Sequence, residues 1–298
     1  MAKQNLIRFD WAMKRLLRNK VDYTVLEGFL SVILNETIKI INIKDSETNK
    51  THADDKFNRA DMLVENSGGE LLIIEMQNNS EVDYLMRMLY GVSKVVTEHL
   101  KKGDRYGRIR KIYHINIVYF TLGDGEDYVY HGIADFRGIH RNNVLKLTDE
   151  QKQFFMKENV EDLFPEYYIL CVRDFDNVAR DSLDEWIYYL KNTEIPDHFT
   201  ASGLKEAREQ LQYDKLSEEE KKAYARHLKQ TRFEQNVIED AYASGRFDGE
   251  AIGEAKNQKK VIANGLRAGY PAEIMAVMTG LTVQEVIRII EEIKLEPC

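Results

Sequence analysis

The stretch from Arg59 to Gln77, RADMLVENSGGELLIIEMQ, predicts a β-hairpin with an acidic residue on each of its two strands. Asp61–Val64 is expected to form a short first strand and Leu71–Glu75 a second, nearly all-apolar one. The intervening turn contains Asn and Gly, which accept the positive φ values that tight hairpin turns require. Antiparallel pairing across this turn would bring Asp61 close to Glu75.

Two carboxylates that meet at the end of a buried sheet repel each other unless a positive group lies between them. A divalent cation such as Mg²⁺, or Mn²⁺ in its place, is the usual partner, because carboxylate oxygens are the hard ligands that it prefers. The hairpin therefore predicts a metal site shared by Asp61 and Glu75.

This constellation resembles the PD-(D/E)XK nuclease superfamily, and more narrowly its branch of PD-(D/E)XK family transposases, related to the recombination-promoting nucleases. In that superfamily one acidic residue begins the hairpin. A second acidic residue and a Lys, separated by one residue, end the next strand. Asp61 and Glu75 match the two acids, and Gln77 stands where the Lys would be. The transposase branch resembles the chain in that departure too, since it carries Ile-Glu-Met-Gln, as at residues 74–77.

The resemblance extends to both sides of the hairpin. Phe9–Trp11 and Leu26–Leu34 look like the opening helices of the family, and Arg87–Tyr90 and Lys111–Phe120 look like its next helix and strand. The resemblance implies an α/β fold: a restriction-endonuclease-like mixed β-sheet flanked by helices. We expect this domain to occupy residues 1–197.

The family's chemistry, carried over to these positions, implies a Mg²⁺-dependent DNA endonuclease that hydrolyses phosphodiester bonds. Asp61, Glu75 and the backbone carbonyl of Met76 would hold the metal. Gln77 would point to the same side as Glu75, because strand side chains alternate. An amide there orients a water molecule but carries no charge, and Arg59 is a candidate for the missing positive charge.

Glu27 is a further auxiliary candidate, because many superfamily members carry a metal-binding acid on the first core helix. The alternative for Glu27 is an exposed position on the polar side of that helix.

A second reading of the whole chain is a catalytically impaired nuclease-fold protein that binds DNA or protein. The Gln at position 77 and the net charge of −8 favour it. A third is a helical interaction protein whose hairpin is only structural.

Contacts to DNA need a local basic patch, because phosphate binding depends on Lys and Arg side chains. Arg87 lies one helical turn from Tyr90 and is one candidate. The other candidates form a basic run, for which the alternative is a solvated loop. Its members are Lys101, Lys102, Arg105, Arg108, Arg110 and Lys111.

Hydrophobic periodicity predicts the remaining elements of the first domain. Helices are expected over residues 8–20, 23–35 and 83–100, and strands over 39–44, 112–120, 128–131 and 167–171. This alternation fits helices packed around one mixed sheet.

The character of the sequence changes after Pro196. Residues 198–254 are expected to form a charged helical arm and linker. Residues 255–298 are expected to form a small helix-turn-helix-like module, with Gly269 ending one helix and a Thr282-x-x-Glu285 capping box starting the last. DNA recognition is one use of such a module, and packing or homo-oligomerisation through this helical region is the other.

The composition restricts the class of protein. Hydrophobic residues at 43% and charged residues at 31% are ordinary for a soluble globular chain. The two cysteines, Cys171 and Cys298, form no disulfide or zinc pattern, so a reducing cytoplasm is the expected setting. No apolar run approaches the roughly 18 residues that span a bilayer.

Overall fold

The computed structural model describes residues 6–13, 22–44, 62–100 and 103–295. The chain divides into two compact units, Met1–Thr231 and Arg232–Cys298. Among the described residues, every helix is too short or too polar to cross a lipid bilayer.

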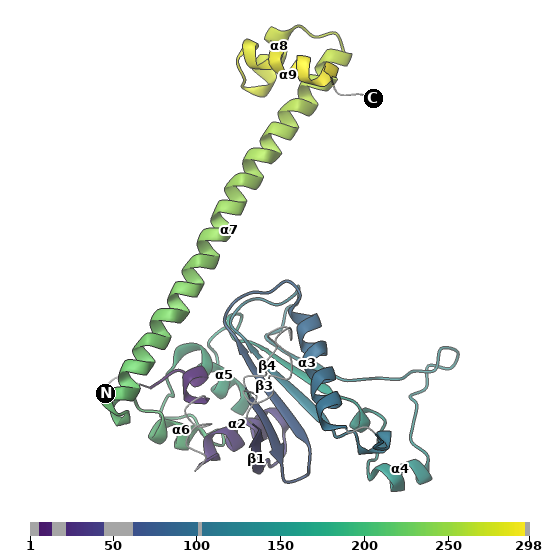
Figure 1. Ribbon diagram of the computed structural model, residues 1–298, viewed down its shortest axis with the longest axis vertical. Helices are drawn as coiled ribbons and strands as arrows, with labels where there is room; N and C mark the ends of the chain where they lie inside the picture. Colours follow the sequence, from purple (N-terminus) through teal and green to yellow (C-terminus); the bar gives the residue numbers. More distant parts are fainter. Residues whose placement is uncertain (1–5, 14–21, 45–61, 101–102, 296–298) are drawn as a thin grey trace. The chain divides into compact units, whose positions relative to one another are not determined.

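The described residues of the first unit form one six-stranded mixed sheet (Figure 1). The first three strands pair antiparallel, the central three pair parallel, and the last edge strand is antiparallel to its neighbour. In spatial order the strands are β1 (Ile40–Lys44), β2 (Met62–Asn66), β3 (Leu71–Gln77), β4 (Ile112–Val118), β6 (Glu166–Cys171) and β5 (Val129–Gly132).

Helices cover both faces of the sheet (Figure 1). One face carries α2 (Thr24–Leu34), α5 (Ser182–Asn192) and α6 (Leu204–Gln210), and the other carries α3 (Tyr84–His99). A shorter helix, α4 (Asp149–Phe155), follows the edge strand β5 in sequence. The mixed sheet flanked by helices confirms the fold class that the sequence predicts.

Strand β3 is apolar along most of its length because both of its faces are covered. Its even-numbered residues Leu72, Ile74 and Met76 enter the main core, whereas Leu71 and Ile73 pack under α3. Helix α3 is the crossover that allows β3 and β4 to run parallel, since a tight turn cannot join parallel strands.

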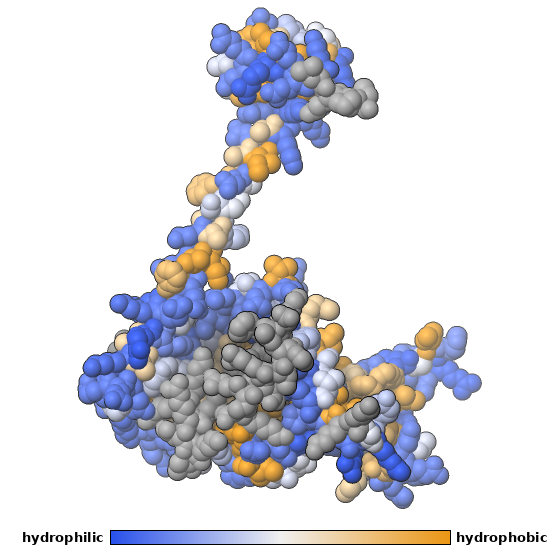
Figure 2. Space-filling view, in the orientation of Figure 1, coloured by the Kyte–Doolittle hydropathy of each residue, from blue (hydrophilic) through white to orange (hydrophobic). Residues whose placement is uncertain are grey.

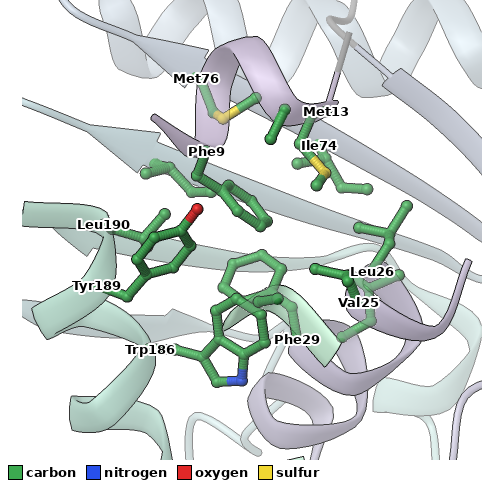
Figure 3. Close-up of a cluster of buried hydrophobic side chains, with 14 of the residues drawn as sticks. Phe9, Met13, Val25, Leu26, Phe29, Ile74, Met76, Trp186, Tyr189 and Leu190 are labelled. Carbon is green, nitrogen blue, oxygen red and sulfur yellow. The ribbon is translucent and has the colours of Figure 1, made fainter. Parts of the chain in front are cut away.

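The main core is centred on aromatic side chains from three distant segments (Figure 3). The ring of Phe29 lies 5.1 Å from both Phe9 and Trp186, in edge-to-face contact with each. Such contacts add to the burial energy of the rings. The buried indole of Trp186 donates its N–H to the carbonyl of Ser202 at 3.0 Å, so its one polar atom is satisfied.

Two glycines allow α2 to pack directly on the turn before α6. A Cβ atom on Gly28 would lie 2.4 Å from the Cα of Gly203, which no side chain tolerates. Gly203 also has a φ of +82°, a conformation that favours glycine. This contact fixes α6 against the main core.

The N-terminal segment closes the first unit by joining its last elements. The backbone N–H of Ile7 donates to the carbonyl of Leu211, and that of Arg8 donates to the hydroxyl of Tyr224. Tyr224 belongs to α7 (Glu218–Arg267), a helix of 50 residues.

The hairpin differs from its predicted boundaries at the turn. Glu65 and Asn66, expected in the turn, belong to β2, and Asn66 pairs with Ile40 of β1. Asn66 also accepts a hydrogen bond from the backbone of Glu70 through its side chain. Pairing with a third strand therefore lengthens the first strand of the hairpin.

The segment after Pro196 also differs from its predicted organisation. Residues 204–211, expected in an exposed arm, bury Leu204, Ala207 and Leu211 in the main core. The segment that contains Gly245, Gly249 and Gly253, by contrast, is helical as expected and lies within α7. At the other end of the chain, residues 9–13 of the helix expected over 8–20 are helical, and residues 14–20 lie outside the described residues.

The second unit packs the end of α7 against α8 (Ala272–Thr279) and α9 (Val283–Leu295). Ile262, Met275, Ala276 and Val286 form its small core. Reciprocal hydrogen bonds between Thr282 and Glu285 form the predicted capping box at the start of α9. Figure 2 shows apolar side chains on the surface of α7 as well.

Asp10 is expected to hold the N-terminal segment in place in a pH-dependent way. It is 4% exposed and interacts with Arg8 and, at 3.1 Å, with His227. Burial raises the pKa of its carboxyl, but the hydrogen bonds and charges of His227 and Arg8 outweigh burial and lower that pKa to about 2. The stabilisation is therefore fully present above the unfolded-state pKa of about 4 and is lost as the pH falls to about 2.

Asp10→Asn is expected to lower the free energy of unfolding at pH 7 by roughly 1–3 kcal/mol, because a buried carboxylate that pairs with Arg8 and is hydrogen-bonded to His227 loses its charge. The difference from wild type should shrink as the pH falls from 4 towards 2. Urea unfolding at pH 7 and pH 3 measures both. Asp135→Asn, which removes the surface partner of Arg137, serves as control and should change the free energy by less than about 0.5 kcal/mol. An Asp10→Asn effect no larger than the control's would contradict this role.

Candidate active site

Glu75 lies near the carboxyl end of β3, on the face that packs under α3. The register of the sheet places it beside Asn116 of β4. Its side chain is buried, at 4% exposure for the residue. Across from it α3 carries Gly91, where a Cβ atom would lie 3.6 Å from Glu75 Oε1. The carboxylate therefore lies directly against this turn of α3, between helix and sheet.

The Glu75 carboxylate faces two nitrogen groups without a hydrogen bond to either. The Nε of Arg87 lies 3.9 Å from its Oε2, and the Nε2 of His114 lies 3.7 Å from its Oε1. Oε2 is buried and has no hydrogen-bond partner among the described residues. Burial of a carboxylate oxygen without a hydrogen bond is costly, and such an oxygen is the type of donor that a hard cation binds.

Gln77 takes part in a small polar network at the end of β3. Its amide nitrogen donates to Oε1 of Glu81 at 2.7 Å, and the Nη1 of Arg87 donates to the same oxygen at 2.8 Å. Glu81 lies between β3 and α3, in the segment that turns the chain from sheet to helix. The network therefore joins Gln77 to the guanidinium that also faces Glu75.

Burial disfavours the charged form of the Arg87 guanidinium. The hydrogen bond to Glu81 and the attraction of the Glu75 and Glu81 carboxylates outweigh that effect, and on balance the pKa of Arg87 is raised. Arg87 therefore remains a cation beside Glu75.

The other predicted metal-site residues have different positions. Met76 packs its side chain into the main core, so any part it plays at the site falls to its backbone. Asp61 and Arg59 lie outside the described residues, as do Lys101 and Lys102. The described part of β2 begins at Met62, which pairs with Ile74, the neighbour of Glu75.

The described residues alone do not complete a metal site. Among them, no group of three or more His, Cys, Asp or Glu side chains is arranged to hold a metal ion. Of the two acids expected to share the metal, Glu75 lies in the part of the chain that the structure describes and Asp61 lies outside it.

Glu27 is engaged with the start of β1. Its Oε1 accepts the backbone N–H of Ile40 at 2.9 Å, and its Oε2 forms an ion pair with Lys39 at 2.8 Å. The serine one turn later, Ser31, donates its hydroxyl to the Glu27 carbonyl and accepts the N–H of Ile38. These contacts tie α2 to the edge of the sheet.

The basic run after α3 is partly used within the fold. Arg110 forms an ion pair with Glu65 at 2.7 Å, and the buried Lys111 forms one with Glu166 at 2.7 Å. Arg105 is exposed, and Arg108 pairs with Asp104 at the surface. The interior contacts of Arg110 and Lys111 leave Arg105 and Arg108 as the solvent-facing members in the described part of the run.

Sequence reasoning did not identify the buried polar row beside Glu75. The hydroxyl of Tyr84 donates to Asn116, and the Asn116 amide donates to the carbonyl of His114 at 3.1 Å. Both ring nitrogens of His114 are buried without a hydrogen bond. The sequence does contain a signal for this row: His114 and Asn116 are two polar residues, two positions apart, on an apolar strand. Residues two apart on a strand share one face, so their side chains are expected to lie side by side.

A comparison with models of protein families identifies the family of the chain. The family model described as PD-(D/E)XK nuclease family transposase matches residues 7–241, which include the hairpin, α3 and β4. No curated protein and no solved structure matches the chain. The match spans most of the 298 residues, so the chain belongs to the PD-(D/E)XK nuclease family transposases, as the hairpin predicted.

Proposed function

We propose that the protein is a metal-dependent DNA endonuclease that hydrolyses phosphodiester bonds. The observation that carries this proposal is the buried Glu75 carboxylate at the end of an apolar strand, with one oxygen that lacks a hydrogen-bond partner. Membership in a nuclease family gives the carboxylate a chemical context. An oxygen of this kind is unfavourable in a purely structural position but suits a cation ligand.

Carboxylate and carbonyl oxygens are the donors that Mg²⁺ and Mn²⁺ prefer. The last described pair of the hairpin is Met62–Ile74, and Asp61 and Glu75 are the next residues in sequence on either side of it. We propose that these two carboxylates and the backbone carbonyl of Met76 hold the ion. When bound, such an ion stabilises charge on a phosphoryl oxygen and lowers the pKa of its bound water.

The chain's own side chains would position water and DNA. Gln77 lies on the strand two residues beyond Glu75, and we propose that its amide orients the attacking water. The Arg87 guanidinium, together with Arg59, would bind the phosphate that is cleaved. Lys101, Lys102 and Arg105 would contact the DNA backbone further from the site. Such contacts are electrostatic and independent of base sequence.

A catalytically impaired binding protein of the same fold is the second candidate. The observation that favours it is the amide nitrogen of Gln77, which donates to Glu81 and brings no positive charge to the site. The net charge of −8 also weakens general attraction to DNA.

We also propose that the chain self-associates through α7. Ile238, Tyr242 and Ile252 are exposed, and helical spacing puts them on the same side as Gly245 and Gly249. A Cβ atom on either glycine would meet nothing within 4 Å, so this side is open to the close approach of a second helix. A second copy would bury these apolar side chains.

Cleavage of supercoiled plasmid, and of branched and linear DNA, with Mg²⁺ or Mn²⁺ tests the endonuclease proposal. Wild type should nick DNA only with metal, and Asp61→Ala and Glu75→Ala should each reduce the rate at least about 100-fold because each removes a metal ligand. Asp135→Ala, at an exposed ion pair, is the control that should retain the wild-type rate. Folded wild type that cleaves no faster than the Glu75→Ala protein would favour the impaired binding protein.

Self-association is tested by light scattering coupled to size-exclusion chromatography. The Tyr242→Glu/Ile252→Glu variant should lower the measured mass to that of one chain, because two charges would enter the apolar interface. Phe247→Glu has the same chemistry on another side of α7 and should leave the mass of the assembly unchanged. A wild-type protein that elutes with the mass of one chain at all concentrations would contradict the proposal.

A further inference from the structure

The loop and helix that follow β3 place a second acid and a cation against the site. Glu81 stands four residues after Gln77 and six before Arg87, and one of its oxygens accepts a hydrogen bond from each of them. Arg87 is thus held from one side by Glu81. Its Nε is buried, has no hydrogen-bond partner among the described residues, and lies 3.9 Å from Oε2 of Glu75.

We propose that Glu81 is a positioning residue for Arg87: Arg87 supplies the positive charge that Gln77 lacks, and Glu81 keeps that charge off the metal ligand. This inference rests on the proposed function and deepens it. In the superfamily the positive charge comes from a Lys at the end of the strand, at the position of Gln77. The inference assigns that role to Arg87 of α3, with Glu81 of the preceding loop.

The distances from Arg87 to Glu81 and to Glu75 explain why the proposed arrangement needs both acids. A guanidinium can form two parallel hydrogen bonds with a carboxylate, and such a pair with Glu75 would occupy the oxygens that a metal must bind. The hydrogen bond to Glu81 at 2.8 Å instead retains Arg87 at 3.9 Å from Glu75. At that distance the cation still stabilises the buried carboxylate by Coulomb attraction without a hydrogen bond.

The surrounding packing holds the guanidinium in this position. Arg87 lies one helical turn after Tyr84, with its guanidinium carbon 5.9 Å from the centre of the Tyr84 ring. Tyr84 is fully buried and is anchored to β4 through Asn116. One turn further along α3, Gly91 lies against the carboxylate of Glu75, where a Cβ atom would be 3.6 Å from Oε1.

Arg87→Gln and Glu81→Gln are expected to change the affinity for metal in opposite directions. Arg87→Gln removes the competing cation, so Mn²⁺ should bind about 3–10-fold more tightly. Glu81→Gln releases Arg87 to pair with Glu75, so Mn²⁺ should bind about 3–10-fold more weakly. Calorimetric titration of the full chain with Mn²⁺ measures both, with Glu75→Gln as the baseline. A purely structural role would weaken binding in both variants, and that result would overturn the proposal.

Thermal unfolding of the metal-free chain tests the charge pairing independently of cleavage. Arg87→Gln should lower the Tm by about 5 °C or more in the wild-type background, because it leaves a buried carboxylate without its cation. In the Glu75→Gln background the same change should lower the Tm by less than half as much. Equal losses in both backgrounds would overturn the proposal. Arg137→Gln, at an exposed ion pair, should shift neither.

Plasmid nicking separates this inference from the proposed function. Arg87→Gln should lower the nicking rate about 10–100-fold although it binds metal more tightly, and Arg87→Lys, which keeps the charge, should recover at least part of that loss. Wild type that does not nick DNA would contradict the nuclease proposal. The charge pairing would still stand if Arg87→Gln lowers the Tm more in the wild-type background than in the Glu75→Gln background. If wild type nicks DNA and Arg87→Gln nicks equally fast, the Arg87 proposal fails alone.

Discussion

The alternation of side chains along β3 is the constraint on which the site depends. One set of residues fills the main core and the other packs under α3, so a shift of the strand by one position would turn the Glu75 carboxylate into the apolar main core. The same alternation sets the direction of Glu75. The metal ligand of the proposed site is therefore fixed by the burial of its apolar neighbours, which stabilises the sheet whether or not the site is used.

The parallel pairing of β3 with β4 determines which residues surround Glu75. It requires a crossover, and the crossover helix α3 presents Arg87 and Gly91 to the carboxylate. The row of His114, Asn116 and Tyr84 extends the polar region into the sheet. A buried polar region of this kind opposes stability, and the large aromatic core on the opposite face of the sheet offsets that cost.

Sequence patterns predicted the elements and the position of Glu75, because hydrophobic periodicity is a local property of the chain. The hairpin, α3 and β4 were all expected within a few residues of their observed bounds. The role of Glu81 in binding Gln77 and Arg87 was not predictable, since it depends on how a loop meets a helix. The same limit applies to Arg110 and Lys111, whose acidic partners Glu65 and Glu166 lie far from them in sequence. The partner of a charged side chain is a tertiary property that composition and spacing do not encode.

The bond between Arg8 and Tyr224 joins residues 216 positions apart, and this separation has a consequence for synthesis on the ribosome. At about 5–20 residues per second, some 10–40 s pass between the emergence of the two partners. The hairpin and α3 can form early in that interval, because their contacts are close in sequence. The N-terminal segment, with Phe9 at the centre of the aromatic core, has to wait for the far end of its unit. The nascent chain therefore assembles its site before it can close the core that supports it.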